Sequence, residues 1–428
     1  MHATPTPAGV DLPRGTRVVG SDAHPCVRRS TSVHTPGEPP MKVICDRAAL
    51  LEGINIESGV VASRTPRPQL TCIKLIAEKT GDTGRLTLAA TDAEMSLRLI
   101  SERVDVQEPG EALLPATTIR QIVSAEDAEA NLSFESEGDA CTIRGADAYF
   151  KVLGYDPKDF PAVPEFAEAA KNAKAVFSHP ASSFRRLITK TLFATARENS
   201  RYAINGVLLK RDGKRLEFVS TDGRRLAVAR ANLGPDEKDG GAVTCIIPSK
   251  ALSTLLKLAD DPDETIRIAI TDNQIYFAIG AESNDDPGRA CLASNLVEGS
   301  FPPYEDVIPR DQDIIVRFDR DVMLSAVRRA ALLTNEESRG VEMSFNAADK
   351  TLELSSAAPE LGESKITVDL LEYKGDDISL GFNPAFVSDA LKVIEEPEVI
   401  IELSTPKKPG VIKAGSDFVY VVMPVNIQ

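Results

Sequence analysis

Hydrophobic and polar positions follow one order three times between Met41 and the C-terminus. Each copy begins with a short apolar strand and an amphipathic helix, and several short strands rich in Val, Ile, Leu and Thr follow. Period-two stretches bounded by turn residues predict strands, whereas a period of 3.6 predicts helices. The opening strand and helix of the copies are expected at 43–44 and 48–61, at 176–177 and 182–196, and at 314–318 and 321–333.

The second half of each copy is a strand, a helix and further strands, with a proline near the strand–helix junction. These units lie at 112–123, 246–258 and 380–394. A repeat of roughly 130 residues is a domain duplication rather than a solenoid unit. Such a triplication favours a symmetric or pseudo-symmetric assembly. We expect a disordered N-terminal extension at 1–40 and domains at 41–170, 171–310 and 311–428.

The predicted helix at 182–196 shows how each domain is built. Phe184, Leu187, Ile188 and Leu192 fall on one face of this helix, which is the stripe that packs against a sheet. Helices and short strands in each copy predict an α+β fold, with helices on one side of antiparallel sheets.

Composition narrows the class of protein. A hydrophobic content of 42% and a charged content of 26% are ordinary for a globular chain. Six scattered cysteines without a CxxC motif favour a reducing compartment and exclude a structural zinc site. We expect the five cysteines after Cys26 to be buried thiols, and the protein to be cytoplasmic. No apolar run is long enough to span a membrane.

The first 40 residues differ from the rest. They hold seven prolines and three of the four histidines, with little apolar periodicity, so they cannot bury enough surface to order. The histidine spacing fits no metal motif, and we expect no metal and no cofactor. Met41 precedes the first strand, which leaves open that it is the true start.

Charge is unevenly distributed. The chain carries a net charge of −15, which argues against nucleic acid if the charge is spread evenly. Residues 182–201 nevertheless hold five basic side chains against one acid, and the third copy repeats this excess weakly. These residues form either an ordinary solvated helix face or a surface that contacts phosphates. Composition alone leaves both interpretations open.

Five short motifs resemble the bacterial sliding clamp, the β subunit of DNA polymerase III. The resemblance runs from Met41 to the C-terminus. It implies three clamp domains with helices on the inner face and sheets outside, and a head-to-tail homodimer that closes as a six-domain ring around duplex DNA. The motifs are RYAING at 201–206, STDGRRLAV at 220–228, GSFPPY at 299–304, NEESRG at 335–340 and YVVMP at 420–424.

The same resemblance implies a processivity factor of DNA replication that tethers DNA polymerase III. DNA contact would be independent of sequence, through basic side chains and one tyrosine. In the second domain Glu198 and Asn199 replace the expected polar pattern, and Ala203 replaces a tyrosine of some members. The positions that correspond to DNA contacts, or lie on the basic helix, are Arg64, Arg185, Arg186, Lys190, Arg197, Arg201 and Tyr202.

An apolar pocket between the second and third domains would bind short linear peptides of polymerases and the clamp loader. Asp306 and the terminal 425–428 depart from the common pattern. Without the resemblance, 421–425 would be interpreted as a core strand. The pocket positions are Ile204, Thr221, Gly223, Arg224, Arg225, Leu226, Pro302, Val307, Val421, Met423, Pro424 and Val425.

The dimer contact implied by the resemblance joins the first domain of one subunit to the third domain of the other. Leu332 and Leu333 match the apolar pair there, and Phe150 on the predicted edge strand at 149–153 is its expected partner. Both leucines could instead belong to the core of their own domain.

Two other function classes are an enzyme and a protein-binding scaffold without a DNA role. Thr91-Asp92 and Thr221-Asp222 could be paired catalytic carboxylates, but His179 is the only histidine after the extension. The chain has no P-loop, GxGxxG, HExxH or GxSxG motif. We therefore expect no catalytic residue. A protein-binding scaffold without a DNA role would not need the basic helix.

Overall fold

The computed structural model describes residues 40–196, 203–234, 240–334, 340–359 and 361–426. These residues belong to one compact unit, Pro39–Gln428. The predicted extension and three predicted DNA contacts, Arg197, Arg201 and Tyr202, lie outside the described residues.

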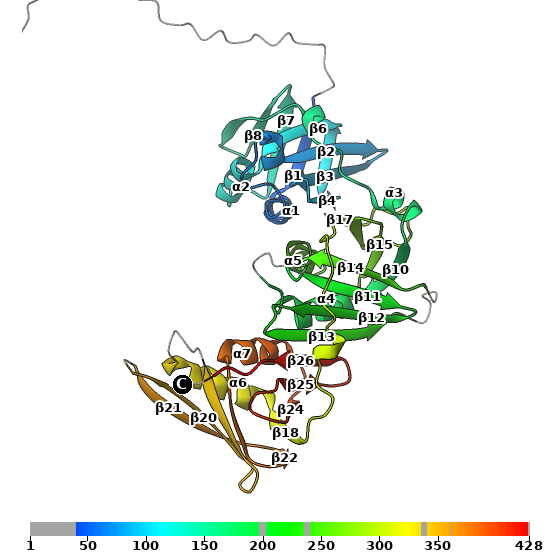
Figure 1. Cartoon of the computed structure of the whole chain (residues 1–428). Helices are drawn as coiled ribbons and strands as arrows, with labels where there is room; N and C mark the ends of the chain where they lie inside the picture. Colours follow the sequence, from blue (N-terminus) through cyan, green and yellow to red (C-terminus); the bar gives the residue numbers. More distant parts are fainter. Residues whose placement is uncertain (1–39, 197–202, 235–239, 335–339, 360, 427–428) are drawn as a thin grey trace, which may run out of the picture. The chain divides into compact units, whose positions relative to one another are not determined.

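Domain 1 repeats a strand–helix–strands unit twice (Figure 1). Asp46 caps the first helix by accepting a hydrogen bond from the Ala49 amide at 2.9 Å. The first half of domain 1 is β1 (Lys42–Asp46), α1 (Arg47–Glu57), β2 (Cys72–Thr80), β3 (Thr83–Thr91), β4 (Met95–Ser101) and β5 (Val104–Glu108). Its second half is β6 (Gly110–Pro115), α2 (Ala116–Ala125), β7 (Asn131–Glu137), β8 (Ala140–Arg144) and β9 (Tyr149–Leu153).

Domains 2 and 3 follow the same order, and α3 (Phe166–Lys171) lies in the connection before domain 2. Domain 2 comprises β10 (Ala175–Pro180), α4 (Ala181–Leu192), β11 (Gly206–Asp212), β12 (Arg215–Thr221), β13 (Arg225–Asn232), β14 (Val243–Pro248), α5 (Ser249–Leu258), β15 (Thr265–Ile270), β16 (Gln274–Ile279) and β17 (Ala290–Asn295). Domain 3 comprises β18 (Ile314–Asp319), α6 (Arg320–Ala330), β19 (Val341–Asn346), β20 (Thr351–Ala358), β21 (Gly362–Asp369), β22 (Glu372–Lys374), β23 (Ile378–Phe382), α7 (Pro384–Val393), β24 (Glu398–Leu403), β25 (Gly410–Ala414) and β26 (Phe418–Val422).

Two sheets run across the domain junctions. The last strand of domain 2, β17, pairs antiparallel with β4 of domain 1, and the last strand of domain 3, β26, pairs antiparallel with β13 of domain 2. Two strands occupy the equivalent positions in the remaining domains: β9, the last strand of domain 1, and β21, the third strand after the first helix of domain 3. Neither of them pairs with a strand of another domain in the described part of the chain. Each is the outermost strand of its sheet.

The helices form one contiguous row. Within the domains α1 contacts α2, α4 contacts α5 and α6 contacts α7, while α1 with α5 and α4 with α7 connect neighbouring domains. Each of these helices packs against strands of its own domain, as Figure 1 shows. The predicted α+β fold with three similar domains and antiparallel sheets is confirmed.

Buried side chains confirm the predicted cysteine behaviour. All five cysteines of the described residues are buried and free. Burial raises the pKa of the Cys45, Cys141 and Cys245 thiols to about 12. Few thiolates therefore exist at neutral pH, and the native thiols should react slowly. No helix of the described residues combines the length and the hydrophobicity needed to cross a membrane.

Glu57 ends α1 with its side chain fully buried in domain 1. In domains 2 and 3 a serine hydroxyl contacts the equivalent helix end, because Ser220 donates to the Thr191 carbonyl and Ser356 to the Ala330 carbonyl. The corresponding strand position in domain 1 is Ala90. Neither carboxyl oxygen of Glu57 makes a hydrogen bond to the described residues, and burial raises the pKa of Glu57 well above its usual value.

We expect Glu57→Gln to stabilise the protein at pH 8 and to change little at pH 5. The Glu57 carboxyl binds its proton more tightly in the folded state than in the unfolded state. The stability of the protein is therefore highest below the ordinary pKa of a glutamate, and it falls as the pH rises from there through the raised pKa of the folded state. A difference of one between the folded-state and unfolded-state pKa corresponds to about 1.4 kcal/mol in the free energy of unfolding. The midpoint of thermal unfolding measured across this range tests the prediction. Glu52→Gln, at an exposed position of α1, is the matched control, and an equal pH profile for both variants would contradict it.

Candidate nucleic-acid interface and peptide pocket

Exposed cations lie on and beside the helix row. Arg186 on α4 and Arg64 in the loop after α1 are both exposed, without an ion pair in the described part of the chain. Lys257 on α5 and Arg328 on α6 share these properties. In the sequence, Arg328 contributes to the weak basic excess of the third copy without being assigned to the site, and Lys257, the last basic residue of α5, is not singled out. What places Lys257 and Arg328 near the other cations is that α5 and α6 belong to the helix row, and the sequence does not contain this information.

Arg185 has a different role from Arg186. Its guanidinium donates to the Leu256 carbonyl at 2.6 Å and to the Ala259 carbonyl at 2.5 Å, at the C-terminal end of α5. Arg47 and Arg320 make comparable bonds to the ends of α2 and α7. A cation satisfies the free carbonyls of a helix end and its partial negative charge. This position fits domain packing better than direct phosphate contact.

Lys190 is also held inside the protein. Its side chain is only 5% exposed and its ammonium lies 3.3 Å from the Glu396 carboxylate of domain 3. The same ammonium lies 5.6 Å from the centre of the Phe418 ring. These contacts connect domains 2 and 3 and leave little of the charge for DNA.

The turn between β12 and β13 is the centre of the predicted peptide pocket. The Asp222 carboxylate accepts the amides of Arg224 and Arg225 at 3.0 and 3.1 Å. The Thr221 hydroxyl donates to the Arg225 carbonyl at 2.6 Å. Gly223 has a φ of +85°, a conformation that glycine adopts without a steric penalty. Asp222 is thus a turn residue, and its position offers no support for a catalytic role.

Strand β26 of domain 3 continues the pocket. Leu226 and Val421 are cross-strand partners, and both are buried in a hydrophobic cluster with Tyr304. The Met423 amide donates to the Arg224 carbonyl at 2.9 Å. Two side chains of the predicted pocket are accessible, since Met423 is 39% and Val307 49% exposed. Ile204 is buried, and Thr221, Pro302, Pro424 and Val425 are at least partly covered.

Arg225 is engaged at the junction of domains 2 and 3. Its guanidinium forms ion pairs with Asp222 at 2.9 Å and with Asp389 of α7 at 3.0 Å. It also donates to the Phe193 carbonyl at 2.9 Å and lies 4.4 Å from the centre of the Phe386 ring. The neighbouring Arg224 is exposed, so of the two arginines only Arg224 has a guanidinium available to a peptide.

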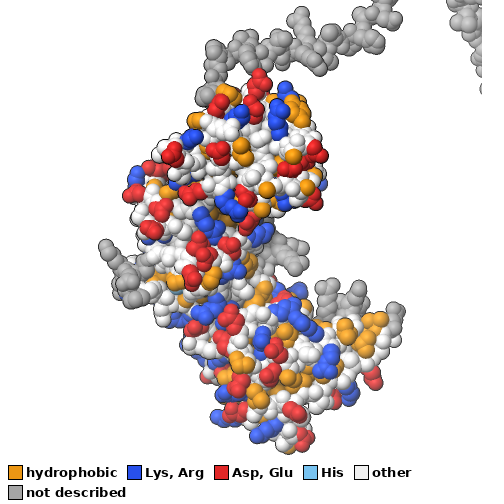
Figure 2. All heavy atoms as spheres, turned by 180° about the vertical axis from the view of Figure 1, so that it is seen from behind, with side chains coloured by type: hydrophobic (Ala, Val, Ile, Leu, Met, Phe, Trp, Pro, Cys, Tyr) orange, Lys and Arg blue, Asp and Glu red, His pale blue; other side chains and the backbone are white. Residues whose placement is uncertain are grey.

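The predicted dimer residues lie near free sheet edges. Leu332 is 74% exposed, and Leu153 on β9 is also 74% exposed. Leu333 and Phe150 are half-buried. Figure 2 shows hydrophobic side chains on the surface of the domain that contains the β20–β21 hairpin, and it shows acidic and basic side chains intermingled elsewhere on that face.

Comparison with known proteins decides the family. Three family definitions match in sequence along the chain: the N-terminal, central and C-terminal domains of the DNA polymerase III β subunit, at 41–164, 179–303 and 305–426. The chain belongs to this sliding clamp family. The β sliding clamp of Pseudomonas aeruginosa is 31% identical over 391 residues, covering 90% of this chain and all of that protein. The β sliding clamp of Escherichia coli K12 is 29% identical over 390 residues, with the same coverage.

Solved sliding clamp structures agree with the fold. A Pseudomonas aeruginosa clamp bound to griselimycin has a TM-score of 0.80 at 29% identity, covering 91% of this chain and all of that one. A Bacillus subtilis clamp also has a TM-score of 0.80, at 26% identity and the same coverage. The resemblance found in the sequence motifs is therefore confirmed for the family and the fold. The individual DNA, peptide and dimer residues remain predictions.

Proposed function

We propose that this sliding clamp is a non-catalytic processivity factor whose head-to-tail homodimer encircles duplex DNA and tethers a polymerase to it. The observation that carries the proposal is the repeated junction. Two of the three domains already donate their last strand to a neighbouring domain. Pairing β9 with β21 of a second copy, and the reverse, would repeat that junction twice more and close a ring of six domains.

The two existing junctions supply the register of the proposed one. Leu97 of β4 pairs with Leu292 of β17, and Ala227 of β13 pairs with Tyr420 of β26. In domain 1 the residue that corresponds to Leu292 and Tyr420 is Phe150. Each of the three pairs with an equivalent residue of the preceding strand: Leu292 with Phe277, Tyr420 with Ile412, and Phe150 with Ile143. In domain 3 the residue that corresponds to Ala227 is Ser364. Ala227 pairs with Ser220 and Ser364 pairs with Ser356, and these two serines contact equivalent helix ends. Phe150 would therefore lie opposite Ser364 of the partner subunit.

Two pairs in this register are complementary, one in charge and one in apolar character. In an antiparallel pair Lys151 would face Glu363, and Leu153 would face Leu361. Leu153 is 74% and Leu361 61% exposed in the single chain, so their burial would stabilise the dimer. An edge strand with exposed leucines also invites pairing with another strand.

DNA contact would come from the helix row. Arg64, Arg186, Lys257 and Arg328 are exposed cations there, and their long side chains suit weak contacts with phosphates that are independent of sequence. The chain as a whole carries a net charge of −15, which would limit contacts of DNA with other surfaces of the clamp.

The peptide pocket completes the proposal. Short linear segments of polymerases and of the clamp loader would place apolar side chains against Leu226, Val421 and Met423. Methionine adapts to different apolar partners, which suits a pocket that several proteins use in turn. A cytoplasmic location and the domain limits 41–170, 171–310 and 311–428 are part of the proposal.

Retention on nicked circular DNA tests the function. Clamp loaded by a clamp loader should stay on circles through gel filtration in high salt and should be lost once the circles are linearised. Arg186→Glu with Lys257→Glu should lower loading at moderate salt, whereas Lys407→Glu with Lys408→Glu, on the exposed turn between β24 and β25, should not. Equal retention on linear DNA would rule out encirclement.

A further inference from the structure

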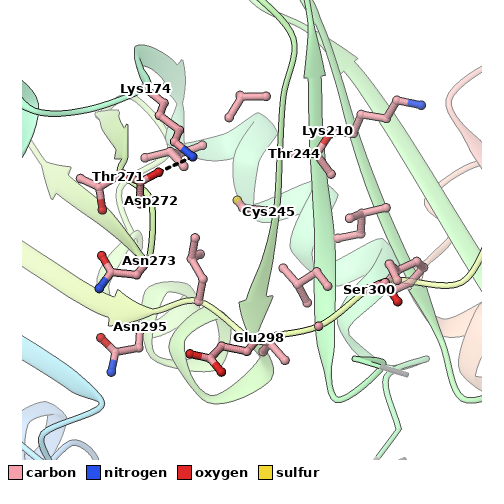
Figure 3. Close-up of a pocket in the computed structure, with 18 of the residues that line it drawn as sticks. Lys174, Lys210, Thr244, Cys245, Thr271, Asp272, Asn273, Asn295, Glu298 and Ser300 are labelled. Carbon is pink, nitrogen blue, oxygen red and sulfur yellow. Dashed lines mark ion pairs between the residues drawn. The ribbon is translucent and has the colours of Figure 1, made fainter. Parts of the chain in front are cut away.

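Domain 2 contains a cavity of about 910 Å³ beside its outermost strand, β14. Figure 3 shows Thr244 and Lys210 on one wall, with the ion pair between Lys174 and Asp272 on the other. The connection after β17 crosses the cavity. Aliphatic and aromatic residues that line it are Leu208, Val243, Ile246, Ile270, Leu296 and Phe301.

The cavity gives access to backbone groups of Thr244 on β14 that have no hydrogen-bond partner among the described residues. The Val297 amide donates to the Ile246 carbonyl at 2.9 Å, so the backbone groups of Ile246 point away from β11. Alternate residues of a strand point the same way. The amide and carbonyl of Thr244 therefore also point outward, and Thr244 is exposed. A sheet edge of this kind can accept an extended peptide as an added strand.

The corresponding edge of domain 1 carries an ion pair. There the Tyr155 amide donates to the Leu113 carbonyl at 3.0 Å, in the place of the Val297 bond. Glu111 then corresponds to Thr244, and Lys74, the partner of Leu113, corresponds to Leu208. Lys74 and Glu111 form an ion pair at 2.7 Å. Domain 2 has an apolar side chain, Leu208, and a hydroxyl, that of Thr244, at these two positions, so no ion pair lies beside its edge strand there.

The charges around the cavity favour a basic ligand. Lys174 is paired with Asp272 at 2.5 Å, and Lys210 lies 3.3 Å from Glu305. Two further carboxylates line the cavity, Glu94 and Glu298. Glu94 accepts a hydrogen bond from the Asn295 amide group at 2.8 Å, and neither carboxylate has a cation partner among the described residues. Both are exposed and can receive Lys or Arg side chains of a bound peptide.

We propose that this groove is a second docking site, which binds an extended peptide segment of a partner protein by adding it as a strand to β14. The segment alternates aliphatic and basic side chains. The aliphatic ones contact the apolar floor, and the basic ones face Glu94 and Glu298. The site goes beyond the proposed function, because the β14 edge, Glu94 and Glu298 are not part of the predicted pocket at the junction of domains 2 and 3. The two sites are neighbours, since Pro302 belongs to the predicted pocket and also lines this cavity.

A fluorescein-labelled peptide of alternating valine and lysine is the probe, and fluorescence anisotropy with the full chain is the measurement. Thr244→Pro removes one outward amide from an edge strand, where proline is tolerated, and should weaken binding about tenfold. Thr244→Ala should bind as the wild type does. Glu94→Lys with Glu298→Lys should weaken binding by at least about tenfold. Asp127→Lys with Glu137→Lys changes charge equally at exposed positions of domain 1 and should have no effect.

Three results would overturn the proposal. They are undetectable binding of the probe, equal affinity for the Thr244→Pro and Thr244→Ala variants, and equal affinity for a probe with glutamate in place of lysine. Dimer mass and retention on DNA circles are measured on the same variants. Unchanged values there separate failure of this site from failure of the proposed clamp function.

Discussion

Replacing Leu332 and Leu333 with lysine is expected to convert the proposed dimer into monomers. Leu332 is 74% exposed in the single chain, and in the proposed ring it would be covered by β9 of the partner subunit. Burying an unpaired ammonium costs several kcal/mol, and each closing of the ring would bury four of them. Light scattering after gel filtration would give the mass of one chain instead of two.

The control for this variant carries lysines at other exposed apolar positions. Val322→Lys with Leu371→Lys adds the same charge, at side chains that are 48% and 52% exposed, and it should remain a dimer. A dimeric mass for the Leu332/Leu333 variant would exclude these leucines from the interface.

A charge exchange tests the register separately. Lys151→Glu or Glu363→Lys alone should weaken the dimer, because like charges would face each other across the new strand pair. The two changes together should restore it. Such a recovery measures the coupling between the two positions, so strictly additive losses would exclude the pairing of Lys151 with Glu363.

The sequence predicts three similar domains because each copy repeats the same local periodicity of apolar and polar residues. Phe184, Leu187 and Ile188 are buried as their spacing indicated. Thr221 and Asp222 form the turn that connects two strands, in line with their small polar side chains. These features depend on residues close together in the chain, and the same physical forces act on them in every copy.

The sequence could not separate the roles of neighbouring basic residues. Arg185 and Arg186 are adjacent, yet one bonds the end of α5 and the other is exposed. Lys190 is covered because domain 3 places Glu396 and Phe418 around it. Which flank of a helix meets another domain depends on strand pairing between distant segments, such as β13 with β26, and no local pattern records that pairing.

The second large effect is expected from removal of residues 423–428. Binding of a polymerase-derived peptide should fall below detection, because the change removes three residues of the proposed pocket, Met423, Pro424 and Val425. Strand β26 ends at Val422 and keeps its register with β13 and β25. The two backbone bonds lost, from Met423 to Arg224 and from Val425 to Gly381, lie beyond that strand. Fluorescence anisotropy with a labelled peptide is the measurement.

A smaller change separates the side chain from the backbone. Met423→Asp keeps the amide that bonds Arg224 and places a charge beside the apolar floor of Leu226 and Val421. We expect a loss of affinity nearly as large as that from truncation, because an apolar anchor would have to bury the carboxylate. Both variants should retain the dimer mass of the wild type. Peptide affinity equal to that of the wild type in the truncated protein would remove the chain end from the predicted pocket.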